Sequence, residues 1–432
     1  MRRAIALPVV LALAMLYSIA GAAQPKPGSK TAQPKPGTTA AASEKQDQKD
    51  PFKGLEFRNI GPAMTSGRVI DIAIHPNDHD IWYVAVGSGG LWKTLNAGTT
   101  WQPVFEKEAS YSVGCVAIDP RHPEIVWVGS GENVGGRHVG YGDGVYRSLD
   151  AGTSWKKLGL EASEHIGKIV IDPKNSNVVY VAAQGPLWSE GGERGLYKTT
   201  DGGTTWNRML GGGPYTGVTD VVMDPRDSDV LYAATHQRLR TVAALIDGGP
   251  ESAIHKSVDG GKTWRKLEKG LPDEQMGRIG LALSPQNPDV VYATIELAHR
   301  KGGFWRSADA GGSWEKRSDV VAGGTGPHYY QEIFPSPHQF DRVYMADVRL
   351  RCTEDGGKTF RSVEGKFKHV DNHAIAFDPH DPNFVLVGCD GGLYESRDLC
   401  ATWRFVGNLP VTQFYKVAVD RSEERRVGKE CA

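Results

Sequence analysis

The chain has 432 residues and an almost balanced charge, with 50 Lys and Arg against 51 Asp and Glu. Domains that bind nucleic acid through a basic face carry a clear positive excess, so this composition argues against a nucleic-acid partner. On length alone the chain could hold about three ordinary domains. The repeats described below favour one repeat architecture instead.

Residues 1–23 predict a cleaved secretory signal peptide. Two arginines near the start precede an apolar run over 4–19, and Ala20-Gly-Ala22 provides a small-residue cleavage site. The apolar run is short for a membrane span of about 20 residues. We therefore expect a secreted or periplasmic bacterial protein with no membrane segment beyond the signal. Residues 24–51, rich in Pro, Lys and Gly, indicate a flexible linker.

One short motif recurs seven times between residues 52 and 420. It starts with Ser or Thr, has Asp or Asn at its third position, and ends with Trp or Phe. The copies span 94–101, 148–155, 199–206, 257–264, 307–314, 353–360 and 396–403. A recurring motif with a period of roughly 20–50 residues is the signature of a repeat fold. The motif therefore organises the whole of this region.

Each unit reads as four short strands, A to D, separated by Gly, Pro and Asn turns, with the motif as the C–D turn. The third motif residue can cap backbone N–H groups of the turn, and the glycines allow positive φ. We expect structural roles for these capping residues, which are Asn96, Asp150, Asp201, Asp259, Asp309, Asp355 and Asp398. Four-stranded units arranged around an axis predict an all-β protein, a β-propeller with seven complete blades.

The end of the chain departs from this pattern. A strand-like segment before residue 420 matches strand A of an eighth unit, so the propeller is expected to be truncated at the start of that unit. Residues 421–432 fit no earlier pattern. They resemble the translation of a sequencing-adapter oligonucleotide, and we expect a non-native tail.

Export makes disulfides possible. Cys389 and Cys400 bracket strand C of one unit, which separates them by roughly 20 Å at about 3.3 Å per residue. A disulfide needs Cα atoms within about 7 Å. Cys115 lies on a predicted inner strand and Cys352 in the neighbouring unit. We therefore expect free thiols, and no residue pattern indicates a cofactor.

The motif resembles the Asp-box of bacterial-neuraminidase repeats. With the segments 57–62, 89–93, 194–198 and 369–373, it gives the chain a resemblance to secreted bacterial propellers described as sortilin-like or glycosyl-hydrolase-like. Members of that family are usually longer. The resemblance implies that C–D turns lie on the outer lower rim, whereas B–C turns and D–A links surround the axis on the opposite face. It brings no established activity.

Three B–C segments are elaborated, over 131–143, 185–194 and 236–252. Long loops on a rigid scaffold are a usual place for binding, although ordinary loop variation explains them as well. The candidate ligand-binding residues in these loops are Glu132, Asn133, Arg137, His138, Trp188, Arg194 and Arg238. Trp188 is favoured because an indole can stack on a sugar face.

A further constellation is His369-x-Asp371-x-His373, whose period of two places all three side chains on one face of a strand. Asp390 in the following B–C turn could join them. A hydrogen-bonded cluster is favoured over a divalent metal site or a substrate contact, because His369 and His373 are too far apart on a straight strand to chelate easily. We therefore assign no metal.

These features favour a binding or scaffold module for extracellular or periplasmic peptides or glycans, expected to be a monomer. The alternative is a glycoside hydrolase, sialidase-like or xyloglucanase-like, acting on polysaccharide. Such enzymes generally use two carboxylates about 5–10 Å apart. The sequence distinguishes no pair among Glu132, Asp143, Glu190, Asp371 and Asp390. The xyloglucanase resemblance also implies an aspartate in an early Asp-x-Gly-Gly turn, where this chain has Gly87-Ser-Gly-Gly90. A purely structural assembly factor remains a third reading.

Overall fold

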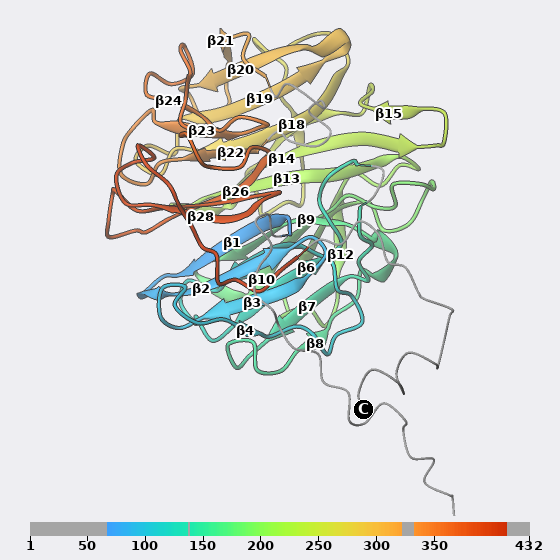
Figure 1. Ribbon diagram of the computed structural model, residues 1–432. Coiled ribbons are helices and arrows are strands. Elements are labelled where there is room, and N and C mark those ends of the chain that lie inside the picture. The colour runs from blue at the N-terminus through green and yellow to red at the C-terminus, as the bar shows by residue number, and fades with distance from the viewer. Residues whose placement is uncertain (1–66, 137–138, 322–331, 413–432) are drawn as a thin grey trace, which may run out of the picture. The chain divides into compact units, whose positions relative to one another are not determined.

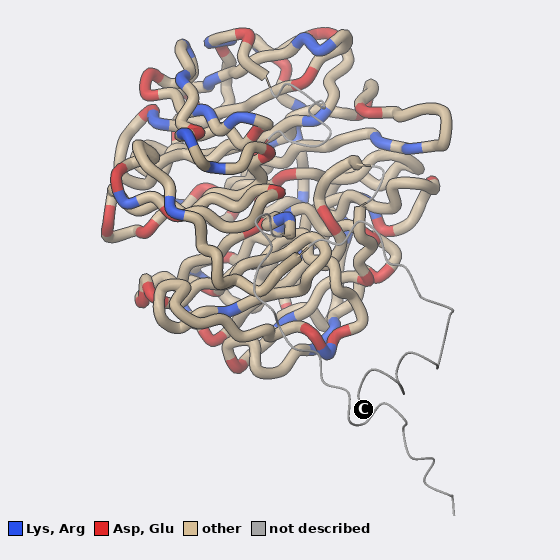
Figure 2. Tube along the Cα trace, in the orientation of Figure 1, with Lys and Arg blue, Asp and Glu red and all other residues tan. Residues whose placement is uncertain are grey.

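The computed structural model describes residues 67–136, 139–321 and 332–412. The predicted signal peptide, linker, eighth unit and adapter-derived tail lie outside these residues. Within the described part, no helix is long and apolar enough to cross a membrane. Acidic and basic residues alternate along the described chain rather than gathering by sign (Figure 2).

The described chain forms seven antiparallel sheets, each a meander in the order A, B, C, D. The first three blades are β1 (Val69–His75), β2 (Asp78–Val86), β3 (Gly90–Thr94) and β4 (Gln102–Pro103); β5 (Val113–Ile118), β6 (Val126–Ser130), β7 (Val145–Ser148) and β8 (Lys156–Lys157); and β9 (Ile166–Asp172), β10 (Asn175–Ala183), β11 (Gly195–Thr199) and β12 (Asn207–Leu210).

Blade 4 comprises β13 (Thr216–Asp224), β14 (Asp227–Arg240), β16 (Ala253–Ser257) and β17 (Arg265–Lys266), and the extra strand β15 (Leu245–Asp247) pairs with the end of β14. The last three blades are β18 (Met276–Leu283), β19 (Val291–Leu297), β20 (Lys301–Ser307) and β21 (Glu315–Ser318); β22 (Glu332–Pro335), β23 (Val343–Ala346), β24 (Arg351–Thr353) and β25 (Arg361–Ser362); and β26 (Asn372–Phe377), β27 (Val385–Cys389), β28 (Gly392–Ser396) and β29 (Arg404–Phe405).

The A strands contact one another in sequence from β1 to β26, and β26 contacts β1 (Figure 1). This closes a ring of seven blades and confirms the predicted all-β propeller. Among the described residues, the helical segments are two short 3₁₀ turns, η1 (Glu161–Ser163) and η2 (Ala298–Arg300). The core lies between adjacent blades, where apolar side chains of the B strands pack against those of the next blade. Each blade therefore depends on its neighbours for its buried surface.

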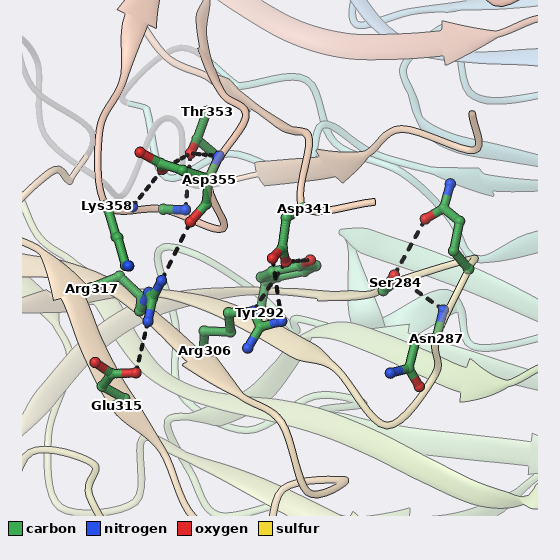
Figure 3. A network of polar contacts seen from close by, with 12 residues as sticks. Ser284, Asn287, Tyr292, Arg306, Glu315, Arg317, Asp341, Thr353, Asp355 and Lys358 are labelled. Carbon is green, nitrogen blue, oxygen red and sulfur yellow. Dashed lines mark hydrogen bonds and ion pairs between the residues drawn. The ribbon is translucent and has the colours of Figure 1, made fainter. Parts of the chain in front are cut away.

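The motif forms the same tight turn in every blade. In blade 4, Asp259 Oδ1 accepts hydrogen bonds from Ser257 Oγ (2.8 Å) and Thr263 N (2.9 Å), and Oδ2 accepts one from Thr263 Oγ1 (2.6 Å). These bonds lower the pKa of Asp259 to about 2. Figure 3 shows the equivalent turn of blade 6, where Asp355 bonds Thr353 and the backbone of Lys358.

A second repeated feature, the blade clamp, joins several of the motifs to the preceding blade. It consists of an aromatic residue on strand B, a cation opposite it on strand C, and a carbonyl of the next motif. Tyr83 Oη and Lys93 Nζ donate to the oxygen of Ala151 at 2.9 and 2.8 Å. The clamp recurs with Tyr180, Lys198 and Gly260, and with Tyr232, Lys256 and Ala310. Between blades 2 and 3 only the cation contributes, through Arg147 and Gly202.

Between blades 5 and 6 the geometry differs. Tyr292 and Arg306 both bond the carboxylate of Asp341, which lies in the A–B turn of blade 6 (Figure 3). The cost of leaving a cation half-buried is offset by these charge-assisted bonds. The clamp thus explains why a basic residue stands immediately before five of the seven motifs.

Candidate functional site

A ring of equivalent positions lines the axis. Counted back from the proline that follows each A strand, the fifth residues are Asp71, Cys115, Lys168, Asp220, Gly280, Glu332 and Ala374. Four of them, with Asn133 and Arg278, surround a cavity of about 20 Å³ between the inner strands. This volume is close to that needed by a single water molecule. We call Asp71, Lys168, Asp220, Glu332 and Arg278 the axial ring.

A β-bulge in the A strand precedes two of these side chains, Asp71 and Asp220, and turns them towards the neighbouring inner strand. The pairing register shifts between Val69 and Asp71 in β1, and between Val218 and Asp220 in β13. Asp71 Oδ2 then accepts a hydrogen bond from the backbone N–H of Val116 in blade 2 (2.9 Å). Asp220 makes the same bond to Leu281 in blade 5 (2.9 Å). The carboxylates therefore tie neighbouring inner strands together.

The axial ring is strongly coupled through its charges. Burial raises the pKa of Asp71 and of Asp220, and it raises the pKa of Glu332 to about 7, against the pull of Arg278 and Lys168. Burial disfavours the charge of Lys168, but Asp220, Glu332 and Asp71 outweigh it and raise the Lys168 pKa above its usual range. A buried lysine is tolerated here because three carboxylates surround it.

A second group lies at the end of the axis that carries the B–C turns, and we call it the Arg68 cluster. Arg68 Nε donates to Asp390 Oδ1 (2.7 Å) and its Nη1 donates to Glu132 Oε2 (3.0 Å). His373 Nε2 lies 2.8 Å from Asp390 Oδ1. Ser88 Oγ approaches Glu132 Oε1 at 3.4 Å. One guanidinium thus bridges two carboxylates from blades 2 and 7.

The pKa values of the two carboxyl groups, Glu132 and Asp390, shift in opposite directions. Burial raises the pKa of Glu132 to about 7, and Arg68 only partly offsets this. For Asp390, burial is outweighed by His373 and Arg68, which hold the pKa below its usual range. Burial also lowers the pKa of His373, against the attraction of Asp390. The Glu132 side chain is 2% exposed and that of Asp390 is 26% exposed, so Asp390 is the accessible carboxylate.

The predicted common face of His369, Asp371 and His373 is wrong. Strand β26 begins at Asn372, Asp371 has a φ of +64°, and a bulge follows Asn372. His373 still meets Asp390 as expected, whereas His369 Nδ1 faces the oxygen of Val370 (2.6 Å). No set of three His, Cys, Asp or Glu side chains within the described ranges could hold a metal ion.

The arginines of two elaborated loops donate hydrogen bonds to backbone carbonyls in or beside the loop 185–194. Arg194 is fully buried and donates to the carbonyls of Gln184 (2.9 Å), Ser189 (2.8 Å) and Gly191 (2.8 Å) in its own B–C loop. Arg238 is also buried and donates to Gly185 of that loop (2.8 Å). These two predicted ligand contacts therefore hold a loop in place instead of facing solvent.

The remaining predicted ligand-binding residues differ in their exposure to solvent. Asn133 is buried and donates to Glu332 in the axial cavity (3.0 Å). Trp188 is 37% exposed. Arg137 and His138 lie outside the described residues. The sequence reasoning missed Arg68 and the axial ring; the signal for the ring was the repeated position before the proline.

Fold and site together define a seven-bladed β-propeller with a polar axis. The chain belongs to the family described as Sortilin, neurotensin receptor 3 (Sortilin-Vps10), which matches residues 143–296 and 302–427, more than half of the chain. The described cysteines, Cys115, Cys352, Cys389 and Cys400, are unbonded in this structure.

Curated relatives include a xyloglucanase of Hypocrea jecorina, 25% identical over 304 residues, covering 62% of this chain and 34% of that protein. A Paenibacillus xyloglucanase is 21% identical over 379 residues, covering 78% of this chain and 36% of that protein. The solved GH74 xyloglucanase of Xanthomonas campestris aligns with a TM-score of 0.60 and 16% identity, over 81% of this chain and 55% of that one. The chain thus spans about a third of these curated relatives, and the structural likeness shows the fold.

Proposed function

We propose that this chain is the glycan-binding propeller of an exported protein, with the ligand lying across the face that carries the B–C turns and D–A links. The observation that carries the proposal is a row of exposed aromatic side chains on that face. Tyr111 is 64% exposed, Tyr141 is 53% exposed and Trp188 is 37% exposed. They come from the link between blades 1 and 2 and from the B–C loops of blades 2 and 3.

Contacts between the loops join the segments that carry these three rings. Ser110, next to Tyr111, donates through Oγ to the oxygen of Tyr141 (3.1 Å). The Tyr141 ring lies 5.9 Å from that of His165, in the next D–A link. The backbone N–H of Glu193, in the loop that carries Trp188, donates to Ala162 of the same link (3.1 Å). The described parts of these loops therefore support one another across blades 1 to 3.

Exposed aromatic rings on a supported backbone suit the apolar faces of sugar rings. The three rings are uncharged, and the exposed carboxylate of Glu190 lies two residues after Trp188, which disfavours an acidic polysaccharide. The similarity to xyloglucanases makes a xyloglucan-type β-glucan the first ligand to test. A peptide ligand is the competing outcome, and it would depend on backbone hydrogen bonds rather than on ring stacking.

The test is affinity electrophoresis of the chain through gels containing xyloglucan, another neutral glucan, an acidic polysaccharide or gelatin. We expect retardation by neutral glucan, and we expect Trp188→Ala to raise Kd about tenfold or more, since the variant loses both the buried area of the ring and roughly 1 kcal/mol of stacking. Phe340→Ala is the matched control, because Phe340 is 42% exposed but lies in the A–B turn of blade 6 at the opposite end of the strands. Retardation by gelatin alone, or equal effects of both variants, would refute the proposal.

A second candidate is glycoside hydrolysis at the Arg68 cluster. The opposite pKa shifts of Glu132 and Asp390 are those of a protonated acid beside an ionised carboxylate. Both bond one guanidinium, which is compatible with the separation of about 5–10 Å in glycosidases. Release of reducing ends that Glu132→Gln abolishes, with glucan retardation unchanged, would support hydrolysis. Retardation without any release of reducing ends would leave binding as the function of this chain.

A further inference from the structure

Two repeated positions are altered together at one blade joint. The residue before each motif is Lys93, Arg147, Lys198, Lys256, Arg306, Cys352 and Glu395. The fifth motif residue is Gly98, Gly152, Gly203, Gly261, Gly311, Gly357 and Cys400. The sixth blade thus has Cys352 in place of the clamp cation, and the seventh motif has Cys400 in place of the glycine that the clamp approaches.

The register places Cys352 at this joint. Cys352 on β24 pairs directly with Tyr344 on β23, as Lys93 pairs with Tyr83 and Lys256 with Tyr232. Directly paired residues of an antiparallel sheet point to the same face, with Cβ atoms about 5 Å apart. The Cys352 thiol therefore faces blade 7, where the other clamps reach the next motif.

The backbone conformation of the motif directs the Cys400 side chain towards blade 6, where Cys352 lies. A Cβ built at Gly311 would meet the ring of Tyr232 at 3.0 Å, and one built at Gly357 would meet Phe304. Each target belongs to the preceding blade. Cys400 has a φ of +69°, the left-handed region that favours glycine, so its Cβ takes this direction towards blade 6.

The two thiols meet in one cluster. Cys352 is 1% exposed and Cys400 is 4% exposed, and both pack with Tyr344 and Val363 in the core between blades 6 and 7. Tyr344 therefore contacts the same buried cluster as both thiols, and after burial the two thiols are the main causes that raise the Tyr344 pKa.

We propose that Cys352 and Cys400 form a disulfide that fastens blade 6 to blade 7 when the chain folds in an oxidising environment. The bond stands where blades 1 to 4 have the clamp cation, and it accounts for a non-glycine residue at the strained motif position. It differs from the pairing of Cys389 with Cys400, whose residues stand at opposite ends of strand β28.

The oxidant is a disulfide, either a small molecule such as oxidised glutathione or a protein disulfide donor. One cysteine thiolate attacks the oxidant, forms a mixed disulfide and releases one thiol. The second thiolate then attacks the protein sulfur of the mixed disulfide and releases the second thiol. The protein loses two hydrogens and two electrons, and the oxidant gains them.

Folding sets the order of events. Burial raises the pKa of Cys352 to about 11 and that of Cys400 to about 12, so little thiolate exists once the blades have docked. We therefore expect the bond to form while the blades assemble. In the folded thiol form, both cysteines should react slowly with added oxidant.

The test refolds the Cys431→Ser variant from denaturant in a mixture of reduced and oxidised glutathione. After alkylation of free thiols, trypsin releases the peptides Cys352–Lys358 and Asp398–Arg404, because Arg351 and Arg397 precede them. The expected result is one linked species, lighter by two hydrogens than the two peptides together. Recovery of the two peptides only in alkylated form would overturn the proposal.

The thermal midpoint supplies the second readout. A reductant should lower Tm in the parent chain and in Cys389→Ala, but not in Cys352→Ala or Cys400→Gly. Cys400→Gly restores the residue of the other six motifs, so it should fold. A linked peptide without any effect of reductant on Tm would refute the fastening role.

Discussion

Glu332→Gln should remove a large part of the pH dependence of stability. Glu332 lies in the axial cavity, 3.5 Å from Arg278 Nη2 and bonded by Asn133 at 3.0 Å. Burial raises its pKa from 4.5 to about 7. Because the folded-state pKa lies above the unfolded one, the unfolded chain loses this proton first as pH rises. The contribution of Glu332 to stability is therefore greatest below pH 4.5 and falls as pH rises to about 7.

The magnitude follows from the shift. A displacement from 4.5 to about 7 is between two and three pH units, and each unit corresponds to about 1.4 kcal/mol. Between pH 5 and pH 8 this group alone should cost roughly 2–3 kcal/mol of unfolding free energy. A glutamine keeps an oxygen that can accept from Asn133 but does not titrate.

The assay is urea unfolding of the parent chain and the variant at pH 5 and pH 8. The difference between the two pH values should be smaller by about 2–3 kcal/mol in Glu332→Gln. Glu268→Gln is the control, because the Glu268 side chain is 77% exposed. If Glu332→Gln and Glu268→Gln give the same pH dependence as the parent chain, the axial cavity does not hold Glu332 as argued.

Three further expectations concern the clamp, the motif and the Arg68 cluster. Asp309→Ala removes the cap of motif 5 and should cost about 1 kcal/mol of stability without altering glycan retardation; retardation lost at native Tm would contradict a structural role. Lys256→Met removes the 2.7 Å bond to Ala310 and should cost roughly 1 kcal/mol by urea unfolding, with an unchanged midpoint refuting the clamp. Arg68→Met should raise the pKa of Asp390, followed by NMR titration of its side-chain carboxyl carbon, and an unmoved pKa would show that the ion pair is not formed.

The blade architecture was predictable because its signals are local. In most motifs the capping residue, the glycine and the terminal Trp specify one turn through bonds between neighbours in the chain. Their repetition then sets the number of blades. The clamp was not predicted, although its basic residue precedes five motifs, because its acceptor lies in the next blade.

The axial ring was missed for a geometric reason. The sequence argument assumed a straight strand through His369, Asp371 and His373, with alternating faces. The bulge after Asn372 adds one residue and changes which side chains face the axis. The equivalent axial position in that blade is Ala374, one residue after His373.

The buried arginines make the face that carries the B–C turns and D–A links rigid before any ligand binds. A loop that orders only on binding subtracts its lost conformational entropy from the affinity. Here Arg194 already bonds the carbonyls on either side of Trp188, and Arg238 bonds the start of the same loop. Both guanidinium groups are buried, so neither is presented to a ligand on the surface. The face therefore presents a pre-ordered row of rings on a rigid support, which matches an extended neutral chain better than a flexible or acidic ligand.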